Sequence, residues 1–293
     1  MNGSKKTASA KKGERNPSKY ILIIIGVAFF GIMLLWPLAA VLYRALKDGL
    51  ALYIEAITAE YTLSALKVTL IATIVAVLVN TFFGLCASWL LTKFDFKGKN
   101  ILAALIDVPF SISPVIAGLS FIMMFGRNGL ARPLIDWINN TFGTDIALVF
   151  SVPGVILATI FVTFPFVSRE LIPVMNQQGR EEEEAAALFG AKGLAIFRKI
   201  TLPHIKWALV YGIILCTARA LGEFGAVYAV SKTRGETFTL PLEIDALYMS
   251  GSADSITQAF AVSSLLVLMA IAILIIKNIV EYRSEKQSQK EQE

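Results

Sequence analysis

The sequence predicts an all-α integral membrane protein with six transmembrane helices and both termini in the cytoplasm. Three observations predict this fold class: the composition, six long apolar stretches and the distribution of basic residues. The 293 residues are 56% hydrophobic and 17% charged, and their mean hydropathy is +0.65. Soluble domains carry about 25% charged residues. The composition therefore argues against a soluble protein, and also against a disordered chain or a coiled coil.

Six apolar stretches are each long enough to cross a bilayer, because a transmembrane helix needs about 20 apolar residues. Within them, charges occur only at Asp107, Arg219 and Glu223. The first stretch follows a polar leader and is too long for the apolar region of a signal peptide, so we expect it to remain uncleaved. The predicted spans are 20–43, 68–91, 101–125, 146–168, 207–230 and 256–276.

Lys and Arg predict the orientation, because cytoplasmic loops carry an excess of them. If the N-terminus lies inside, the cytoplasmic segments hold 18 Lys and Arg residues and the extracytoplasmic segments hold 7. This bias places the basic N-terminal tail, 1–19, and the polar C-terminal tail, 281–293, in the cytoplasm. The net charge of +5 then reflects membrane topology, so we expect no nucleic-acid partner.

The sequence contains few of the residues that enzymes and metal sites need. His204 is the only histidine, Cys86 and Cys216 are far apart, and neither HExxH nor GxSxG occurs. We therefore expect no catalytic residue, metal site or disulfide. A GxxxxGK[ST] loop is absent, so the chain cannot bind ATP through a P-loop. An intramembrane enzyme and a secondary transporter remain alternatives, although the first lacks a nucleophile with a base and the second an internal repeat.

One predicted cytoplasmic loop, 172–206, is long and strongly patterned. Four glutamates, 181–184, precede an alanine-rich run, which predicts a helix with acids in its first turn and an end near Gly190 and Gly193. A second short helix is expected from Leu194 to about residue 200, until Pro203 ends it. The acids make binding to an anionic lipid surface unfavourable. We therefore predict a docking element for a cytosolic protein, with an apolar side made of Ala186, Leu188, Phe189, Leu194, Phe197 and Ile200.

The spacing of this loop resembles the EAA loop of binding-protein-dependent ABC importer permeases. It reads Glu-Ala-Ala, three residues, Gly, nine residues, Ile, one residue, Leu-Pro. The resemblance implies a MetI-like permease bundle over about 20–280, in which this loop forms the coupling helix that inserts into a cleft of the ATPase subunit. Gly190 would allow a close backbone approach there. The implied ATPase-coupling residues are Glu184, Ala185, Ala186, Gly190, Ile200, Leu202 and Pro203.

Four further segments narrow the resemblance. Segments 107–118, 165–175 and 218–227 are similar to sulfate/thiosulfate permeases, and the last of them is shared with molybdate and tungstate permeases. The segment 234–242 resembles the CysW-type subunit of sulfate permeases rather than its CysT-type partner. The resemblance implies sulfate or thiosulfate import across a prokaryotic plasma membrane, with molybdate or tungstate as the alternative substrate.

The same resemblance implies a non-catalytic transport subunit without a cofactor of its own. ATP and Mg would be bound by a partner, a dimer of CysA-like ATP-binding subunits. The other implied partners are a second, CysT-like permease subunit, an extracytoplasmic sulfate/thiosulfate-binding protein and the lipid bilayer. In this family the external binding protein selects the substrate, so the path through the permease is expected to bind it weakly.

Two charges in the fifth span lie on one helix face, because Arg219 and Glu223 are four residues apart. Charged residues within a span usually face a cavity or a partner. Two interpretations remain open: Arg219 lines or gates an anion path, or the two residues pair and brace the bundle. Gly222 and Gly225 allow a break in this span, which could direct backbone N–H groups towards a dianion.

Polar residues in the third and fourth spans complete the candidates for a translocation path. Prolines near residue 110 predict a kinked third span, in which Ser111 and Ser113 either contact the substrate or bond their own helix backbone. Arg169 is predicted at the inner end of the fourth span, as an interfacial anchor or a gate. The candidate path or gate residues are Arg219, Glu223, Ser111, Ser113 and Arg169.

Overall fold

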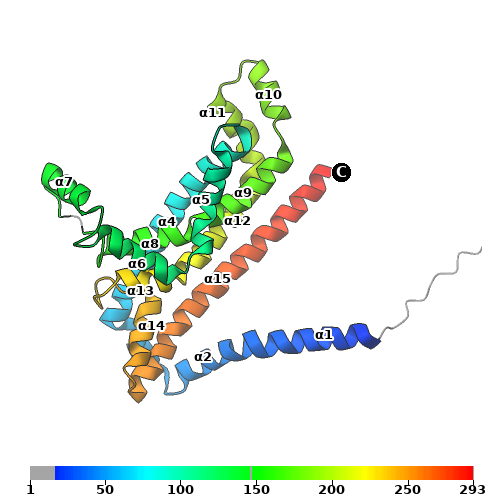
Figure 1. Ribbon diagram of the computed structural model, residues 1–293. Coiled ribbons are helices and arrows are strands. Elements are labelled where there is room, and N and C mark those ends of the chain that lie inside the picture. Colours follow the sequence, from blue (N-terminus) through cyan, green and yellow to red (C-terminus); the bar gives the residue numbers. More distant parts are fainter. Residues whose placement is uncertain (1–16, 146, 293) are drawn as a thin grey trace, which may run out of the picture.

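The computed structural model describes residues 17–145 and 147–292, and this part of the chain is built from helices (Figure 1). Most of the N-terminal tail predicted at 1–19 lies outside the described residues. The helices, with two π-helical turns, are α1 (Pro17–Phe30), η1 (Gly31–Leu35), α2 (Trp36–Leu46), α3 (Leu50–Thr58), α4 (Glu60–Lys93), α5 (Lys99–Ser111), α6 (Pro114–Phe125), α7 (Arg132–Phe142), α8 (Val152–Thr163), α9 (Pro165–Gln178), α10 (Glu181–Leu188), α11 (Gly193–Ile196), η2 (Phe197–Thr201), α12 (Leu202–Leu221), α13 (Gly225–Val230), α14 (Leu240–Met249) and α15 (Ala253–Gln292).

Within the described residues, five helical stretches are long and apolar enough to cross a membrane. Helices α5 and α6 make a sixth if they are counted together, but they are bent by 109° at the break between them. The third predicted span is therefore a broken helix, with a much sharper bend than a proline kink. The five continuous stretches are Lys19–Leu46, Glu60–Lys93, Val152–Gln178, Gly193–Leu221 and Ala253–Arg283.

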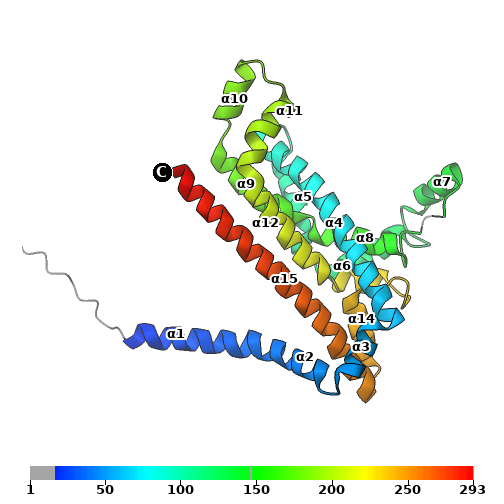
Figure 2. The ribbon, with the colours of Figure 1, turned by 180° about the vertical axis from the view of Figure 1, so that it is seen from behind.

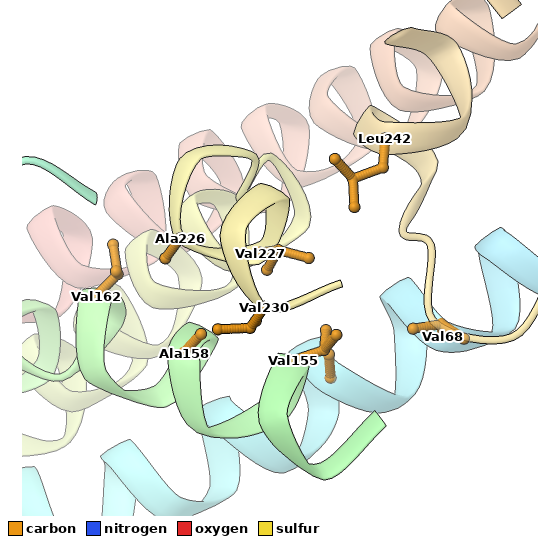
Figure 3. Close-up of a cluster of buried hydrophobic side chains, with 9 residues drawn as sticks. Val68, Val155, Ala158, Val162, Ala226, Val227, Val230 and Leu242 are labelled. Carbon is orange, nitrogen blue, oxygen red and sulfur yellow. The ribbon is translucent and has the colours of Figure 1, made fainter. Parts of the chain in front are cut away.

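The core of the bundle forms where α4 packs against α8, α9 and α12. The buried face of α4 carries mainly small residues, which let neighbouring helices approach closely. A Cβ added at Gly84 of α4 would lie 3.0 Å from Cβ of Val167 on α9. Figure 3 shows the apolar cluster next to this core, where side chains from α4, α8, α13 and α14 meet: Val68, Val155, Ala158, Val162, Ala226, Val227, Val230 and Leu242.

The first long helix leaves the bundle at an angle, as both views show (Figures 1 and 2). Helix α2 packs against α15, and the Arg44 guanidinium lies over the Phe260 ring at 5.2 Å. The most apolar part of Lys19–Leu46 contains no buried residue. This helix therefore exposes its apolar side chains to the surroundings of the subunit.

The prediction that Pro203 ends the short helix after residue 194 is wrong. One helical stretch runs from Gly193 to Leu221 and contains the π-helical turn η2. Proline lacks an N–H, and its ring crowds the carbonyl group four residues earlier. The wider turn at η2 makes room for Pro203 near the start of α12, and Nδ1 of His204 lies 2.7 Å from the carbonyl oxygen of Ile200.

Candidate functional site

Helices α10 and α11 form a hairpin at one end of the bundle, here called the α10–α11 hairpin (residues 181–196) (Figure 1). Four glutamates occupy the first turn of α10, where the helix dipole favours negative charge. At the other end, the N–H of Gly190 donates to the Ala187 carbonyl at 2.9 Å, and the N–H of Ala191 donates to the Ala186 carbonyl at 3.1 Å. This pair of bonds is a Schellman motif, and Gly190 has the positive φ (+85°) that the motif requires.

The tip of the hairpin exposes three large apolar side chains. Leu188, Phe189 and Leu194 are 90%, 94% and 71% exposed. A Cβ added at Gly190 would meet no atom of the chain within 4 Å, so the space over this glycine is open. An apolar tip of this kind is suited to insertion into a cleft of another protein.

The other predicted members of the apolar side lie closer to the bundle. Ala186, Phe197 and Ile200 are half-buried. Phe197 packs against Trp89 of α4, with 5.4 Å between the ring centroids. The predicted apolar side is therefore divided between an exposed tip and a packed base.

The residues of the spaced motif fall in two groups. Glu184, Ala185 and Ala186 lie on α10, and Gly190 follows in the turn. The remaining residues, Ile200, Leu202 and Pro203, lie where η2 passes into α12, and Leu202 packs against the core cluster around α9.

The base of the hairpin is bonded to the end of α4. Arg180 donates from Nη2 to the Thr92 carbonyl at 3.0 Å and from Nη1 to Asp95 Oδ2 at 2.9 Å. Hydrogen bonds from Arg180 and Lys99 lower the pKa of Asp95 to about 2, so this carboxylate is ionised at neutral pH. Nearby, Lys93 pairs with Glu183, with 3.0 Å between Nζ and Oε1. Sequence reasoning missed these residues, because nothing local indicates that α4 ends beside α10.

A second candidate region lies where two helix breaks meet. One break separates α5 from α6 and the other separates α12 from α13, and α6 packs along α13. A Cβ added at Gly118 would lie 2.5 Å from the Ala226 carbonyl oxygen, and one at Gly225 would lie 2.9 Å from Cβ of Pro114. Both glycines are therefore required for this close packing of α6 and α13.

We expect Gly118→Leu to destabilise the protein by about 1–3 kcal/mol, because the added side chain would meet the backbone of α13. Thermal unfolding of the detergent-solubilised chain measures this loss. Gly26→Leu is the matched control, since a Cβ at Gly26 meets nothing within 4 Å. Equal unfolding temperatures for the two variants would show that the contact between α6 and α13 does not constrain the fold.

Arg219 and Glu223 form an ion pair across the second break, with 2.5 Å between Nη1 and Oε2. The Glu223 side chain is 1% exposed and that of Arg219 is 30% exposed. The other carboxylate oxygen, Oε1, accepts a hydrogen bond of 2.8 Å from the N–H of Ala226 in the first turn of α13. The pair thus holds the broken ends of α12 and α13 together, while Arg219 stays partly accessible.

Arg169, predicted at the inner end of the fourth span, lies in the helical stretch Val152–Gln178, which continues beyond it. Its Nε donates to Asp107 Oδ1 at 2.9 Å, and its guanidinium lies over the Phe110 ring at 4.2 Å. The ion pair joins α9 to α5, and both of its side chains are about half exposed.

Ser111 and Ser113 flank the break between α5 and α6, and both are exposed. Neither hydroxyl has a hydrogen-bond partner within residues 17–145 and 147–292. No hydrogen bond or ion pair among these described residues joins the Arg169–Asp107 pair to the Arg219–Glu223 pair. The structure therefore presents the predicted path residues as three separate polar groups.

Comparison with known proteins assigns the family. A family model described as the binding-protein-dependent transport system inner membrane component matches residues 81–286, which include the α10–α11 hairpin and both helix breaks. The chain belongs to this family. Its members with curated descriptions include the sulfate transport system permease protein CysW of Synechocystis, which is 43% identical over 91% of this chain and 94% of the relative.

Further relatives and solved structures agree with this family. CysW of Escherichia coli K12 is 42% identical, over 95% of this chain and 93% of the relative. CysT of Salmonella typhimurium is 34% identical, over 84% of this chain and 88% of the relative. A bacterial ABC transporter that imports alginate has a similar fold, with a TM-score of 0.75 and 18% identity over 93% of this chain and 96% of that chain. The protein is a multi-pass membrane protein with the all-helical, MetI-like ABC permease fold.

Proposed function

We propose that this chain is the membrane-spanning permease subunit of an ATP-driven ABC importer for sulfate or thiosulfate. The α10–α11 hairpin is the observation that carries the proposal. It combines the spaced EAA-type motif, a Schellman turn at Gly190 and an exposed apolar tip at Leu188 and Phe189. These features suit a coupling helix that docks into an ATPase subunit.

The substrate assignment rests on the relatives. The CysW relatives at 42–43% identity are sulfate transport permeases by description, and they align with more than 90% of this chain. The alternative substrates, molybdate and tungstate, rest only on the shared segment 218–227. Sulfate or thiosulfate is therefore the better-supported substrate class.

The chain is expected to be non-catalytic and to work with three kinds of partner. A CysT-like permease subunit would complete the path, a dimer of CysA-like subunits would bind ATP and Mg, and an extracytoplasmic protein would deliver the anion. The exposed first helix, Lys19–Leu46, supports a membrane neighbour. A bacterial alginate ABC transporter of similar fold was solved in complex with a periplasmic protein that holds an alginate pentasaccharide, which supports the last partner. Both termini and the hairpin are assigned to the cytoplasmic side of the plasma membrane.

Transport would proceed by switching between two states. ATP closes the ATPase dimer, which draws the docked hairpins together and tilts the helices from inward-open to outward-open. ATP and the loaded binding protein must both favour the same state. Arg219, Arg169, Ser111 and Ser113 would offer weak, partly exposed contacts to the anion along the path.

Uptake of labelled sulfate into proteoliposomes tests the proposal. The reconstituted complex contains this chain, a CysT-like subunit, the ATPase and the binding protein, with thiosulfate and molybdate as competitors. We expect ATP-dependent uptake that thiosulfate blocks and molybdate does not. Uptake of molybdate but not of sulfate would overturn the substrate assignment. If an assembled complex took up no oxyanion in an ATP-dependent way, the importer function itself would be overturned.

A further inference from the structure

We propose that Lys93 and Glu183 form a buried strut that makes the end of α4 move together with the α10–α11 hairpin. The movement that ATP imposes on the hairpin would then reach the bundle through α4. Both are positioning residues, since neither lies at the exposed tip of the hairpin. This inference rests on the proposed function, because it names the path by which that function couples ATP to transport.

One carboxylate oxygen joins three helical elements. Lys93, the last residue of α4, places Nζ 3.0 Å from Oε1 of Glu183 on α10, and the two side chains are only 4% and 12% exposed. Thr201, buried at the end of η2, donates from Oγ1 to the same oxygen at 2.6 Å. Lys93 also donates to the Gly179 carbonyl at 2.6 Å. A shielded pair with these extra bonds is screened little by water or salt.

Further bonds beside the strut fix the angle between α4 and the hairpin. Carbonyl groups in the last turn of a helix have no partner within it. The Thr92 carbonyl, in the last turn of α4, accepts from Nε and Nη2 of Arg180 at 3.3 and 3.0 Å. On the other side, Trp89 of α4 packs against Phe197. The end of α4 is therefore held both just before and just after the α10–α11 hairpin.

The chain itself gives the hairpin little rigidity. Gly179, between α9 and α10, has φ of +73°, a conformation that places few steric limits on rotation when the residue is glycine. No hydrogen bond or ion pair in the described part of the chain joins α10 or Arg180 to α15. Without the strut, α10 would be connected to the bundle through its two ends, the contacts of Arg180 and the 3.6 Å approach of Glu182 to His204 on α12.

Helix α4 is well placed to carry a movement across the bundle. It runs without a break for 34 residues and packs against α8, α9, α12 and α14. At its far end, the Tyr61 ring lies 4.6 Å from the Arg234 guanidinium, and the Thr69 hydroxyl accepts from the N–H of Leu240 at 2.8 Å. A displacement at Lys93 would therefore reach the loop between α13 and α14.

The first test measures the number of sulfate ions imported per ATP hydrolysed by the reconstituted complex. We expect Lys93→Met and Glu183→Gln to assemble and hydrolyse ATP, but to lower this ratio at least about tenfold, which corresponds to 1.4 kcal/mol of lost coupling. Lys93→Arg keeps the charge and should retain at least half of the ratio. The control is Lys97→Met, an exposed charge near the strut and outside the hairpin, which should leave the ratio unchanged.

The second test measures whether α4 and the hairpin move together. Cys86 on α4 is exposed, whereas Cys216 is buried, so a spin label attaches selectively to Cys86. A second label at Ala187→Cys, an exposed position on α10, gives one distance between the two labels, which double electron–electron resonance measures. We expect this distance to stay the same when ATP binds to the complex, and to change or broaden on ATP binding when Glu183→Gln is present.

These outcomes separate the strut from the proposed function. If the native complex shows no ATP-dependent uptake, the proposed function fails, and the distance measurement still decides on the strut. If Lys93→Met and Glu183→Gln transport with the native ratio, or if the native distance changes with ATP, the strut is refuted. Failure of every strut variant, Lys93→Arg included, to assemble would also refute it, because the pair would then serve folding alone.

Discussion

Gly190→Asp is expected to abolish ATP-dependent uptake. The residue has φ of +85°, and a left-handed conformation costs a residue with a side chain about 1–2 kcal/mol. The added carboxylate would also point into the open space over the hairpin turn, where the ATPase is proposed to dock. An unpaired charge buried at that interface makes the free energy of docking several kcal/mol less favourable, so we expect docking to weaken by at least about 100-fold.

Co-purification of the ATPase with the permease subunits, together with uptake into proteoliposomes, measures this effect. Gly193→Asp is the matched control, because Gly193 begins α11 with an ordinary φ and an acid is favourable in the first turn of a helix. We expect the control to retain the ATPase. A Gly190→Asp complex that assembles and transports like the native one would refute the docking role of the hairpin turn.

Arg219→Met is expected to have the second large effect. It leaves Glu223, 1% exposed, as a buried carboxylate without its cation. Removing one partner of a buried pair costs about 3–5 kcal/mol, and we expect the lower end because Arg219 itself is partly exposed. The expected result is a complex with a markedly lower unfolding temperature and poor assembly.

The double variant Arg219→Met/Glu223→Gln decides between the two interpretations of this pair. A brace predicts that the double variant regains most of the stability, because no buried charge remains and the amide oxygen still accepts from the Ala226 N–H. If Arg219 instead gates the path, Arg219→Met should keep the native stability but alter sulfate uptake, and the double variant should not regain that uptake. Thermal unfolding and uptake assays on the same preparations distinguish the two results.

Features that depend on neighbouring residues could be predicted from the sequence. The hairpin followed from a run of glutamates and a glycine, which act within one or two helical turns. The break between α12 and α13 followed from Gly222 and Gly225, and the structure has it there. The prediction that the short helix ends at Pro203 was wrong, because the preference of proline for helix ends does not account for a π-helical turn that makes room for its ring.

Features that depend on residues far apart could not be predicted. The serines and prolines near residue 110 indicated a kink, but the 109° bend accompanies the packing of Gly118 against Ala226, more than 100 residues later. The Lys93–Glu183 pair joins residues on two separate helices. Its formation depends on how α10 lies against the end of α4, which no local pattern encodes.

The bend between α5 and α6 also has a consequence for the order of events during synthesis. The two helices have 13 and 12 residues, so each is about 20 Å long, and neither alone spans the 30 Å hydrocarbon core. The close partner of Gly118 is Ala226, which the ribosome adds 108 residues later. At about 5–20 residues per second, α6 waits roughly 5–20 s for α13. During that interval α6 can pack against α8 but lacks α13, its main partner, and its final position is reached only after α13 has been synthesised.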